Sequence, residues 1–164
     1  MKIIDNFIDQ ESFNKLKDTM YDNGGSFPWY HCHYKNFKGD GMSQFVHMFF
    51  TPYNYCSDFH PLIHPIIDRL NATALIRIKA NLTMKTPKPH ICDFHTDVVD
   101  YYKHSKTAVF YINNNNGYTL FKKGKKKVES VENRIVIFDA KQEHTTVTQT
   151  DTNIRIVINL NFYN

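Results

Sequence analysis

The second half of the chain repeats one pattern, an alternation of apolar and polar residues with a period of two. Residues 74–84 are the clearest case, because every second residue from Ala74 to Met84 is apolar and most of the residues between them are polar. A β-strand with one buried face has this pattern. Similar segments follow at residues 106–113, 118–122, 126–131, 134–140, 144–149 and 153–163. Residues 113–117, NNNNG, are predicted to form a turn, since Asn and Gly tolerate positive φ.

The first third of the chain shows helical spacing instead. Between residues 9 and 22, Phe13, Leu16 and Met20 recur at the spacing of a helix, and Asp9 can cap its first turn. A second helix is predicted over residues 61–70, where the apolar residues form one stripe. Residues 26–50 are rich in aromatic residues and broken by Pro and Gly, so we expect a loop that leads into a strand near residues 44–50.

Many short strands behind two helices, without a βαβ rhythm, define the predicted fold class. It is mainly β with N-terminal helices (α+β), and the expected architecture is a double-stranded β-helix, or jelly-roll, barrel. The length of 164 residues is that of one domain. We expect a single domain over residues 1–164, with a helical and loop part at residues 1–73 and the barrel core at residues 74–164.

The last predicted strand has two unlike faces. One face is uniformly apolar, and the other carries Arg155, Asn159 and Asn161 together with Val157. In a barrel that holds a ligand, such a polar face can line the cavity.

Composition excludes several classes of protein. The hydrophobic fraction of 41% and the charged fraction of 22% are those of a soluble globular protein, so disorder and fibrous repeats are not expected. No segment resembles a signal peptide or reaches the roughly 20 apolar residues of a membrane span, so we expect a cytoplasmic protein without membrane contact. The three cysteines form no CxxC pair and are expected to be reduced.

The formal charge of +4 comes in large part from the run at residues 122–127, KKGKKK. The run lies between two predicted strands and contains a glycine. A solvated hairpin turn is favoured over a nucleic-acid contact, because a charge run alone is weak evidence for one. Nucleic acid is therefore not an expected partner, and the sequence does not predict the oligomeric state.

The motif His95-Thr96-Asp97 carries the first chemical signal. Alternate residues of an extended segment project to the same side, so His95 and Asp97 can reach one metal ion. An HxD pair is common, and its weight here comes from His144, which follows the strand-like run RIVIFDA. Two imidazoles and one carboxylate form the facial triad that binds non-haem Fe(II) and leaves coordination positions open. The other seven histidines are expected to be surface or hydrogen-bonded residues.

Arg155 lies on the polar face of the final predicted strand. A guanidinium offers two parallel donors to a carboxylate, which suits the distal carboxylate of a dicarboxylic co-substrate. The alternative is that Arg155 points into water or pairs with a structural acid.

These four residues, His95-x-Asp97, His144 and Arg155, resemble the HxD…H…R signature of the 2-oxoglutarate/Fe(II) oxygenase superfamily. Further segments are similar to small oxygenases of the prolyl-4-hydroxylase-like group, many of them phage-encoded, and together they cover nearly the whole chain. They are IDNF, FPWY, LIRIKANLT, KTAVFYINNNNGYTLF, VESVENRIVIFDAKQEHTT and IRIVINLNF. The resemblance implies a double-stranded β-helix with iron at one mouth and, for a phage protein, a location in the host cytoplasm.

Two more residues receive a role from the resemblance. Thr119 resembles the threonine of the GGET-type turn of prolyl hydroxylases, although the second glycine and the glutamate are absent here. Asn81 stands roughly where related enzymes carry a tyrosine that contacts the 2-oxo acid. Both are predicted to contact 2-oxoglutarate.

The resemblance further implies the reaction. Fe(II), 2-oxoglutarate and O2 would give succinate, carbon dioxide and a hydroxylated C–H bond in a prolyl residue of a protein or in a small molecule, with ascorbate as a reductant. Two other functions stay open on the sequence: an AlkB-type nucleic-acid demethylase, and a non-catalytic, cupin-like jelly-roll binding protein.

Overall fold

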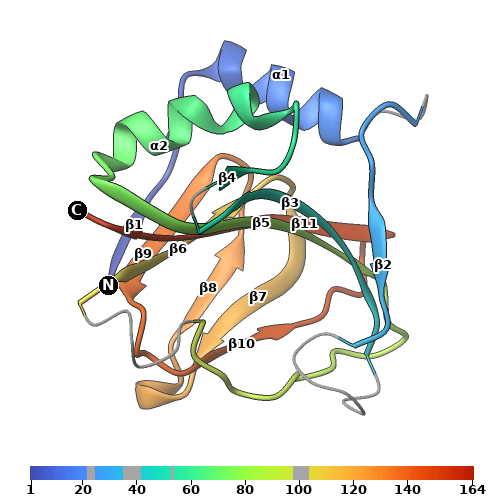
Figure 1. Ribbon diagram of the computed structural model, residues 1–164. Coiled ribbons are helices and arrows are strands. Elements are labelled where there is room, and N and C mark those ends of the chain that lie inside the picture. The colour runs from blue at the N-terminus through green and yellow to red at the C-terminus, as the bar shows by residue number, and fades with distance from the viewer. Residues whose placement is uncertain (22–24, 35–41, 53, 98–103) are drawn as a thin grey trace.

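The computed structural model describes residues 1–21, 25–34, 42–52, 54–97 and 104–164. Within these ranges the chain forms two antiparallel sheets and two short α-helices (Figure 1). The predicted class, mainly β, is confirmed. Of the predicted loop over residues 26–50, residues 35–41 lie outside the described residues.

The large sheet has eight strands in the order β1-β9-β6-β11-β5-β3-β2, and β4 pairs with β3. Their bounds are β1 (Lys2–Ile4), β9 (Arg134–Asp139), β6 (Lys106–Tyr111), β11 (Ile154–Tyr163), β5 (Ala74–Met84), β3 (Gln44–Thr51), β2 (Tyr30–Cys32) and β4 (Asn54–Tyr55). The small sheet has three strands in the order β10-β7-β8, with the bounds β10 (His144–Val147), β7 (Asn115–Phe121) and β8 (Lys127–Ser130).

The helices cover one face of the large sheet (Figure 1). Helix α1 (Gln10–Met20) begins where Asp9 accepts a hydrogen bond from the backbone N–H of Ser12 at 2.9 Å, which satisfies one free donor of the first turn. Helix α2 (His64–Leu70) follows the 3-10 helix η1 (His60–Ile63), so the single helix predicted over residues 61–70 is divided in two. No helix among the described residues is long and apolar enough to cross a membrane.

Two hydrophobic clusters fill the two sides of the large sheet. The larger cluster lies between this sheet and the helices, and among its buried members are Phe13, Leu16, Ile66 and Phe110. The smaller cluster joins the large sheet to the small one and consists of Val109, Tyr111, Phe121, Val128, Val136, Phe138 and Val157. The small sheet therefore packs on the face of the large sheet that the helices leave uncovered (Figure 1).

Strand β11 lies in the middle of the large sheet, between β6 and β5, and its two faces differ as predicted. The apolar face enters the larger core through Ile156, Ile158, Leu160 and Phe162. The polar face turns toward the small sheet, where Arg155 and Asn159 line a cavity. The alternation in the sequence thus separates the residues of the core from those of the cavity.

The structure corrects two details of the strand prediction. The turn predicted over residues 113–117 is shorter, because β7 already begins at Asn115. The Asn115 side chain accepts a hydrogen bond from the N–H of Gly117 at 3.0 Å, and this bond accompanies a bulge opposite β8. Strands β1, β2 and β4 were not predicted, since segments of two or three residues are too short to show a period of two.

The basic run forms the tip of the β7–β8 hairpin, where the 3-10 helix η2 (Lys123–Lys125) contains Gly124 at a φ of 73°. Lys122 pairs with Glu143 at 2.7 Å, and both side chains are largely exposed. A solvated hairpin tip is what the sequence predicted here.

Candidate metal centre

A short backbone pairing brings the two predicted histidine ligands together. The N–H of His95 donates to the carbonyl of His144, and the N–H of His144 donates to the carbonyl of His95, both at 3.0 Å. The rings of the two histidines lie 4.8 Å apart. The segment that ends at Asp97 therefore runs antiparallel beside β10, which explains how residues far apart in sequence meet.

Asp97 completes a cluster of three ligand groups. One of its carboxylate oxygens lies 3.8 Å from Nε2 of His95 and the other lies 3.6 Å from Nε2 of His144. One ligand atom from each of the three residues lies within 4.8 Å of the others. The Oδ2 atom of Asp97 is buried and has no hydrogen-bond partner, although buried polar atoms normally have one.

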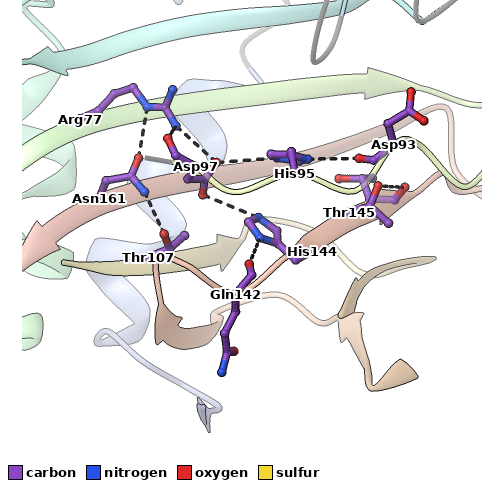
Figure 2. Close-up of polar contacts among 10 residues, drawn as sticks. Arg77, Asp93, His95, Asp97, Thr107, Gln142, His144, Thr145 and Asn161 are labelled. Atoms are coloured by element: carbon purple, nitrogen blue, oxygen red, sulfur yellow. Dashed lines mark hydrogen bonds and ion pairs between the residues drawn. The ribbon is translucent and has the colours of Figure 1, made fainter. Parts of the chain in front are cut away.

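Both imidazoles are oriented by carbonyl groups behind them. Nδ1 of His144 lies 3.0 Å from the carbonyl of Gln142, and Nδ1 of His95 lies 3.2 Å from the carbonyl of Asp93. A proton on each Nδ1 would donate to these carbonyls, leaving the Nε2 lone pairs directed at Asp97 (Figure 2). Metal-binding histidines in proteins are commonly held in this way.

A chain of polar contacts fixes the Asp97 carboxylate from the other side (Figure 2). Nη2 of Arg77, on β5, lies 3.3 Å from Oδ1 of Asp97, and Nε of the same guanidinium donates to Asn161 at 3.2 Å. The amide of Asn161 in turn donates to Thr107 at 2.9 Å. Burial alone would raise the pKa of Asp97, but electrostatic interactions with His144, the charged Arg77 and His95 hold that pKa below its usual range. The carboxylate is therefore the stable form.

The cluster opens into a cavity of about 260 Å³ between the two sheets. Its walls are largely polar, and every residue predicted to contact the metal or 2-oxoglutarate lies on them. They are Asn81, His95, Asp97, Thr119, His144 and Arg155, joined by Gln44, Arg77, Lys79, Thr83, Thr96, Val109, Thr146, Val157 and Asn159.

Arg155 projects from β11 into this cavity and is only 2% exposed. Its Nε donates to the Ser130 hydroxyl at 2.8 Å, and its guanidinium carbon lies 5.7 Å from the centre of the Tyr111 ring. Its Nη2 is buried without a hydrogen-bond partner, and no described carboxylate pairs with it. Burial lowers the pKa of Arg155, while Tyr111 raises it. Arg155 thus neither points into water nor pairs with a structural acid, and an anion in the cavity would compensate its charge.

Comparison with solved structures finds this architecture in several enzymes. A member of the 2OG-Fe(II) oxygenase family from Burkholderia pseudomallei aligns over 98% of this chain and 84% of its own, with a TM-score of 0.73 and 10% identity. A prolyl hydroxylase from Trichoplax adhaerens, in complex with a peptide fragment of the hypoxia inducible factor oxygen degradation domain, covers 99% and 82%, with a TM-score of 0.68 and 12% identity. HygX from Streptomyces hygroscopicus, with nickel and 2-oxoglutarate bound, covers 98% and 81%, with a TM-score of 0.65 and 8% identity.

The chain has the fold of the 2-oxoglutarate/Fe(II) oxygenases. No family model matches the sequence, and no curated protein does. At these low identities the fold, rather than overall sequence similarity, connects the chain to these structures.

Within this oxygenase fold, three residues shape the surroundings of Arg155. The Tyr111 hydroxyl donates to Oγ1 of Thr119 at 2.8 Å, and both side chains are buried. Gly117 lies against the arginine stem, because a Cβ added there would be 3.0 Å from Cδ of Arg155 and 3.0 Å from the backbone nitrogen of Gln149. A side chain at this position would therefore crowd the stem of Arg155.

The sequence analysis did not assign a role to Arg77 or Lys79. Both lie on β5 in alternation with Asn81, so the period of two that puts Asn81 on the polar face of the strand also places them on this face, which lines the cavity. Tyr111 and Ser130 gave no sequence signal. Their contacts with Arg155 follow from the packing of the small sheet on the large one.

Proposed function

We propose that this protein is a non-haem Fe(II) dioxygenase that couples the oxidative decarboxylation of 2-oxoglutarate to hydroxylation of a C–H bond. The observation that carries the proposal is the pairing, within one cavity, of a three-ligand cluster with a buried arginine whose Nη2 lacks a partner. A metal would satisfy Oδ2 of Asp97, and a carboxylate would satisfy Nη2 of Arg155; both atoms lack a hydrogen-bond partner.

The proposed metal ligands are His95, Asp97 and His144. Two imidazoles and one carboxylate suit Fe(II) and leave positions open for a chelating 2-oxo acid and for dioxygen. Iron held there would supply the activation of O2, which no protein side chain can perform. The carbonyls behind the two imidazoles and the Arg77 guanidinium would hold the three ligands in place.

The proposed contact of Arg155 is the distal carboxylate of 2-oxoglutarate, with Thr119 and Asn81 beside it. Both neighbours are buried and line the cavity. The Thr119 hydroxyl already accepts from Tyr111, so its own proton is available to a carboxylate oxygen. Burial strengthens the arginine–carboxylate pair, because little water competes for it. HygX, which shares the fold, binds 2-oxoglutarate together with nickel.

The finer architecture is part of this proposal. The two facing antiparallel sheets fit a jelly roll, and we assign it to the double-stranded β-helix form in a single domain over residues 1–164. The proposed location is the cytoplasm. An origin in a phage rests on the resemblance in sequence alone.

The alternatives gain little support. The basic run that would favour a nucleic-acid demethylase lies on the tip of a hairpin, with Lys122 paired to Glu143. A binding barrel without catalysis would not need an arginine with an unpaired Nη2 opposite the ligand cluster. The structurally similar prolyl hydroxylase from Trichoplax binds a peptide, which is compatible with a protein substrate for this chain. Ascorbate would serve as a reductant.

Succinate formation tests the proposal. Purified protein with Fe(II), ascorbate, air and 2-oxoglutarate is expected to release succinate, and Asp97→Ala is expected to release none, since one ligand of three is lost. Calorimetric titration of 2-oxoglutarate into the Ni²⁺-loaded protein tests binding separately. If the wild-type protein neither forms succinate nor binds 2-oxoglutarate, the oxygenase assignment is wrong.

A further inference from the structure

One cationic side chain in the cavity, that of Lys79, has no role in the proposed reaction. Lys79 lies on β5 between Asn81 and Arg77 along the cavity face. Within the described residues it forms no ion pair and donates no hydrogen bond. Burial lowers the pKa of Lys79, and the charge of Arg77 lowers it further, while Asp97 and Cys32 act in the opposite direction. A largely buried ammonium without a partner costs free energy, and an anionic ligand would offset that cost.

The neighbouring strand supplies a second polar group at the same position. Asn159 of β11 is the register partner of Lys79 and lines the cavity beside it. Its Oδ1 is buried and has no hydrogen-bond partner. A rotation of the side chain would present its NH2 group at this position instead, so an ammonium and an amide can donate to one oxyanion.

The Lys79–Asn159 position is separate from that of Arg155. Asn159 and Arg155 are four positions apart along β11, which corresponds to about 14 Å of strand. Arg77, the next residue toward the metal cluster on the cavity face of β5, contacts Asp97. Lys79 therefore lies on the cavity wall formed by β5, close to the metal-ligand cluster, while Arg155 lies toward the opposite end of the cavity.

The charges in the cavity do not balance once the co-substrate is counted. Three cationic side chains, Arg77, Lys79 and Arg155, share the walls with one carboxylate, that of Asp97. Iron(II) and the 2-oxoglutarate dianion would cancel each other. The walls would then keep two positive charges in excess. Arg155 would contact the distal carboxylate and Arg77 contacts Asp97, which leaves Lys79 as the cation without a carboxylate contact of its own.

We propose that Lys79 and Asn159 form a second carboxylate-binding position in the cavity, and that this position holds an anionic group of the prime substrate. The inference rests on the proposed function, because it takes Arg155 and the metal to be occupied by 2-oxoglutarate. A carboxylate-binding position at Lys79 and Asn159 would favour a carboxylic acid as the prime substrate. Hydroxylation would then occur at a carbon near that carboxylate. A neutral prolyl side chain would leave the charge of Lys79 unmet.

Acetate is the probe that tests this position. Saturation-transfer NMR of its methyl protons reports weak binding to protein loaded with Zn²⁺, a diamagnetic ion that the same ligands accept, and saturated with 2-oxoglutarate so that Arg155 is blocked. The wild-type protein is expected to give a saturable signal. Lys79→Met keeps the length of the side chain and removes its charge, and it should weaken acetate binding about tenfold.

Lys85→Met is the matched control, because Lys85 lies just beyond β5 and is exposed. It should leave the acetate signal within about twofold of the wild-type value. The affinity for 2-oxoglutarate itself, measured by calorimetry, should be equally unchanged in Lys79→Met. Circular dichroism checks folding, and Lys79→Gln replaces Lys79→Met if the latter does not fold.

Two results would overturn the inference. One is an acetate signal that is absent in the wild type or equal in Lys79→Met. The other is a loss of 2-oxoglutarate affinity in Lys79→Met without any acetate signal, which would assign Lys79 to the co-substrate. If the wild-type protein binds no 2-oxoglutarate, the proposed function fails, and acetate is then measured in an Arg155→Met background, where Lys79 remains the cation under test.

Discussion

Replacing Gly117 by alanine tests how closely the fold is built around Arg155. The backbone of Gly117 is not in the left-handed region, so alanine can adopt its conformation and any cost is steric. The added Cβ would lie 2.9 Å from Oδ1 of Asn115, 3.0 Å from Cδ of Arg155 and 3.0 Å from the backbone nitrogen of Gln149. The backbone nitrogen cannot give way easily, so the arginine and asparagine side chains must move.

The size of the effect follows from these contacts. Overpacking of a filled interior costs about 1–3 kcal/mol, and the reduced entropy of the unfolded chain returns about 0.4–1 kcal/mol. We expect a net loss of about 1–2 kcal/mol, which for a chain of this size lowers Tm by about 2–8 °C. Displacement of the guanidinium should also weaken 2-oxoglutarate binding about tenfold.

A double-mutant cycle identifies the source of the cost. Arg155→Ala removes the Cδ atom, so Gly117→Ala should cost about 1 kcal/mol less in that background than in the wild type. Differential scanning calorimetry gives the four Tm values, and calorimetric titration gives the 2-oxoglutarate affinity. Equal costs in the two backgrounds, or unchanged affinity in Gly117→Ala, would refute the view that Gly117 makes room for Arg155.

Three further predictions concern the metal, the co-substrate position and acid stability. Arg77→Met should lower Ni²⁺ affinity about tenfold, because Asp97 loses the donor that orients it; unchanged affinity in a titration would contradict this role. Arg155→Met should keep or raise the Tm of the ligand-free protein, since a buried charge is replaced by an apolar group, and should abolish the stabilisation by 2-oxoglutarate; stabilisation that persists would assign the carboxylate to another residue. Burial lowers the pKa of His47 below its ordinary value of 6.5, so the unfolded chain takes up the proton first as pH falls. Neutral His47 therefore contributes fully to stability at pH values above the ordinary pKa of histidine. As pH falls below that value, the contribution declines by at most about 1.4 kcal/mol per pH unit until the lowered pKa is passed. Urea unfolding between pH 7.5 and 5.5 should show this decline in the wild type and a smaller one in His47→Gln, and equal slopes would exclude His47 as its source.

The sequence predicted those parts of the fold that depend on local periodicity. The bounds of β5 agree residue for residue with the predicted strand, because its alternation extends over eleven residues. Helix α1 was found from its apolar spacing and its Asp9 cap. The two faces of β11 were separated correctly for the same reason. Short edge strands were missed, since their pairing is decided by the neighbouring strand rather than by their own residues.

The candidate site could be predicted only in part. His95, Asp97, His144 and Arg155 were predicted as site residues because their residue types and order resemble a known signature, and the structure places all four on the wall of one cavity. Their supporting contacts were not predicted. These contacts are long-range, and periodicity contains no information on which strands become neighbours. They are the backbone pairing of His95 with His144, the contact of Arg77 with Asp97, and the packing of Tyr111 and Ser130 against Arg155.

The two-faced strand β11 also limits how this chain can change. Substitutions on one face affect the hydrophobic core between the large sheet and the helices, and substitutions on the other face affect the cavity. The two faces can therefore change independently. An insertion or deletion of one residue within the strand would exchange the faces beyond that point, sending a guanidinium or an amide into hydrocarbon and isoleucines into the cavity. We therefore expect related proteins to vary in length at the loops between strands, and to differ in β11 by substitution alone.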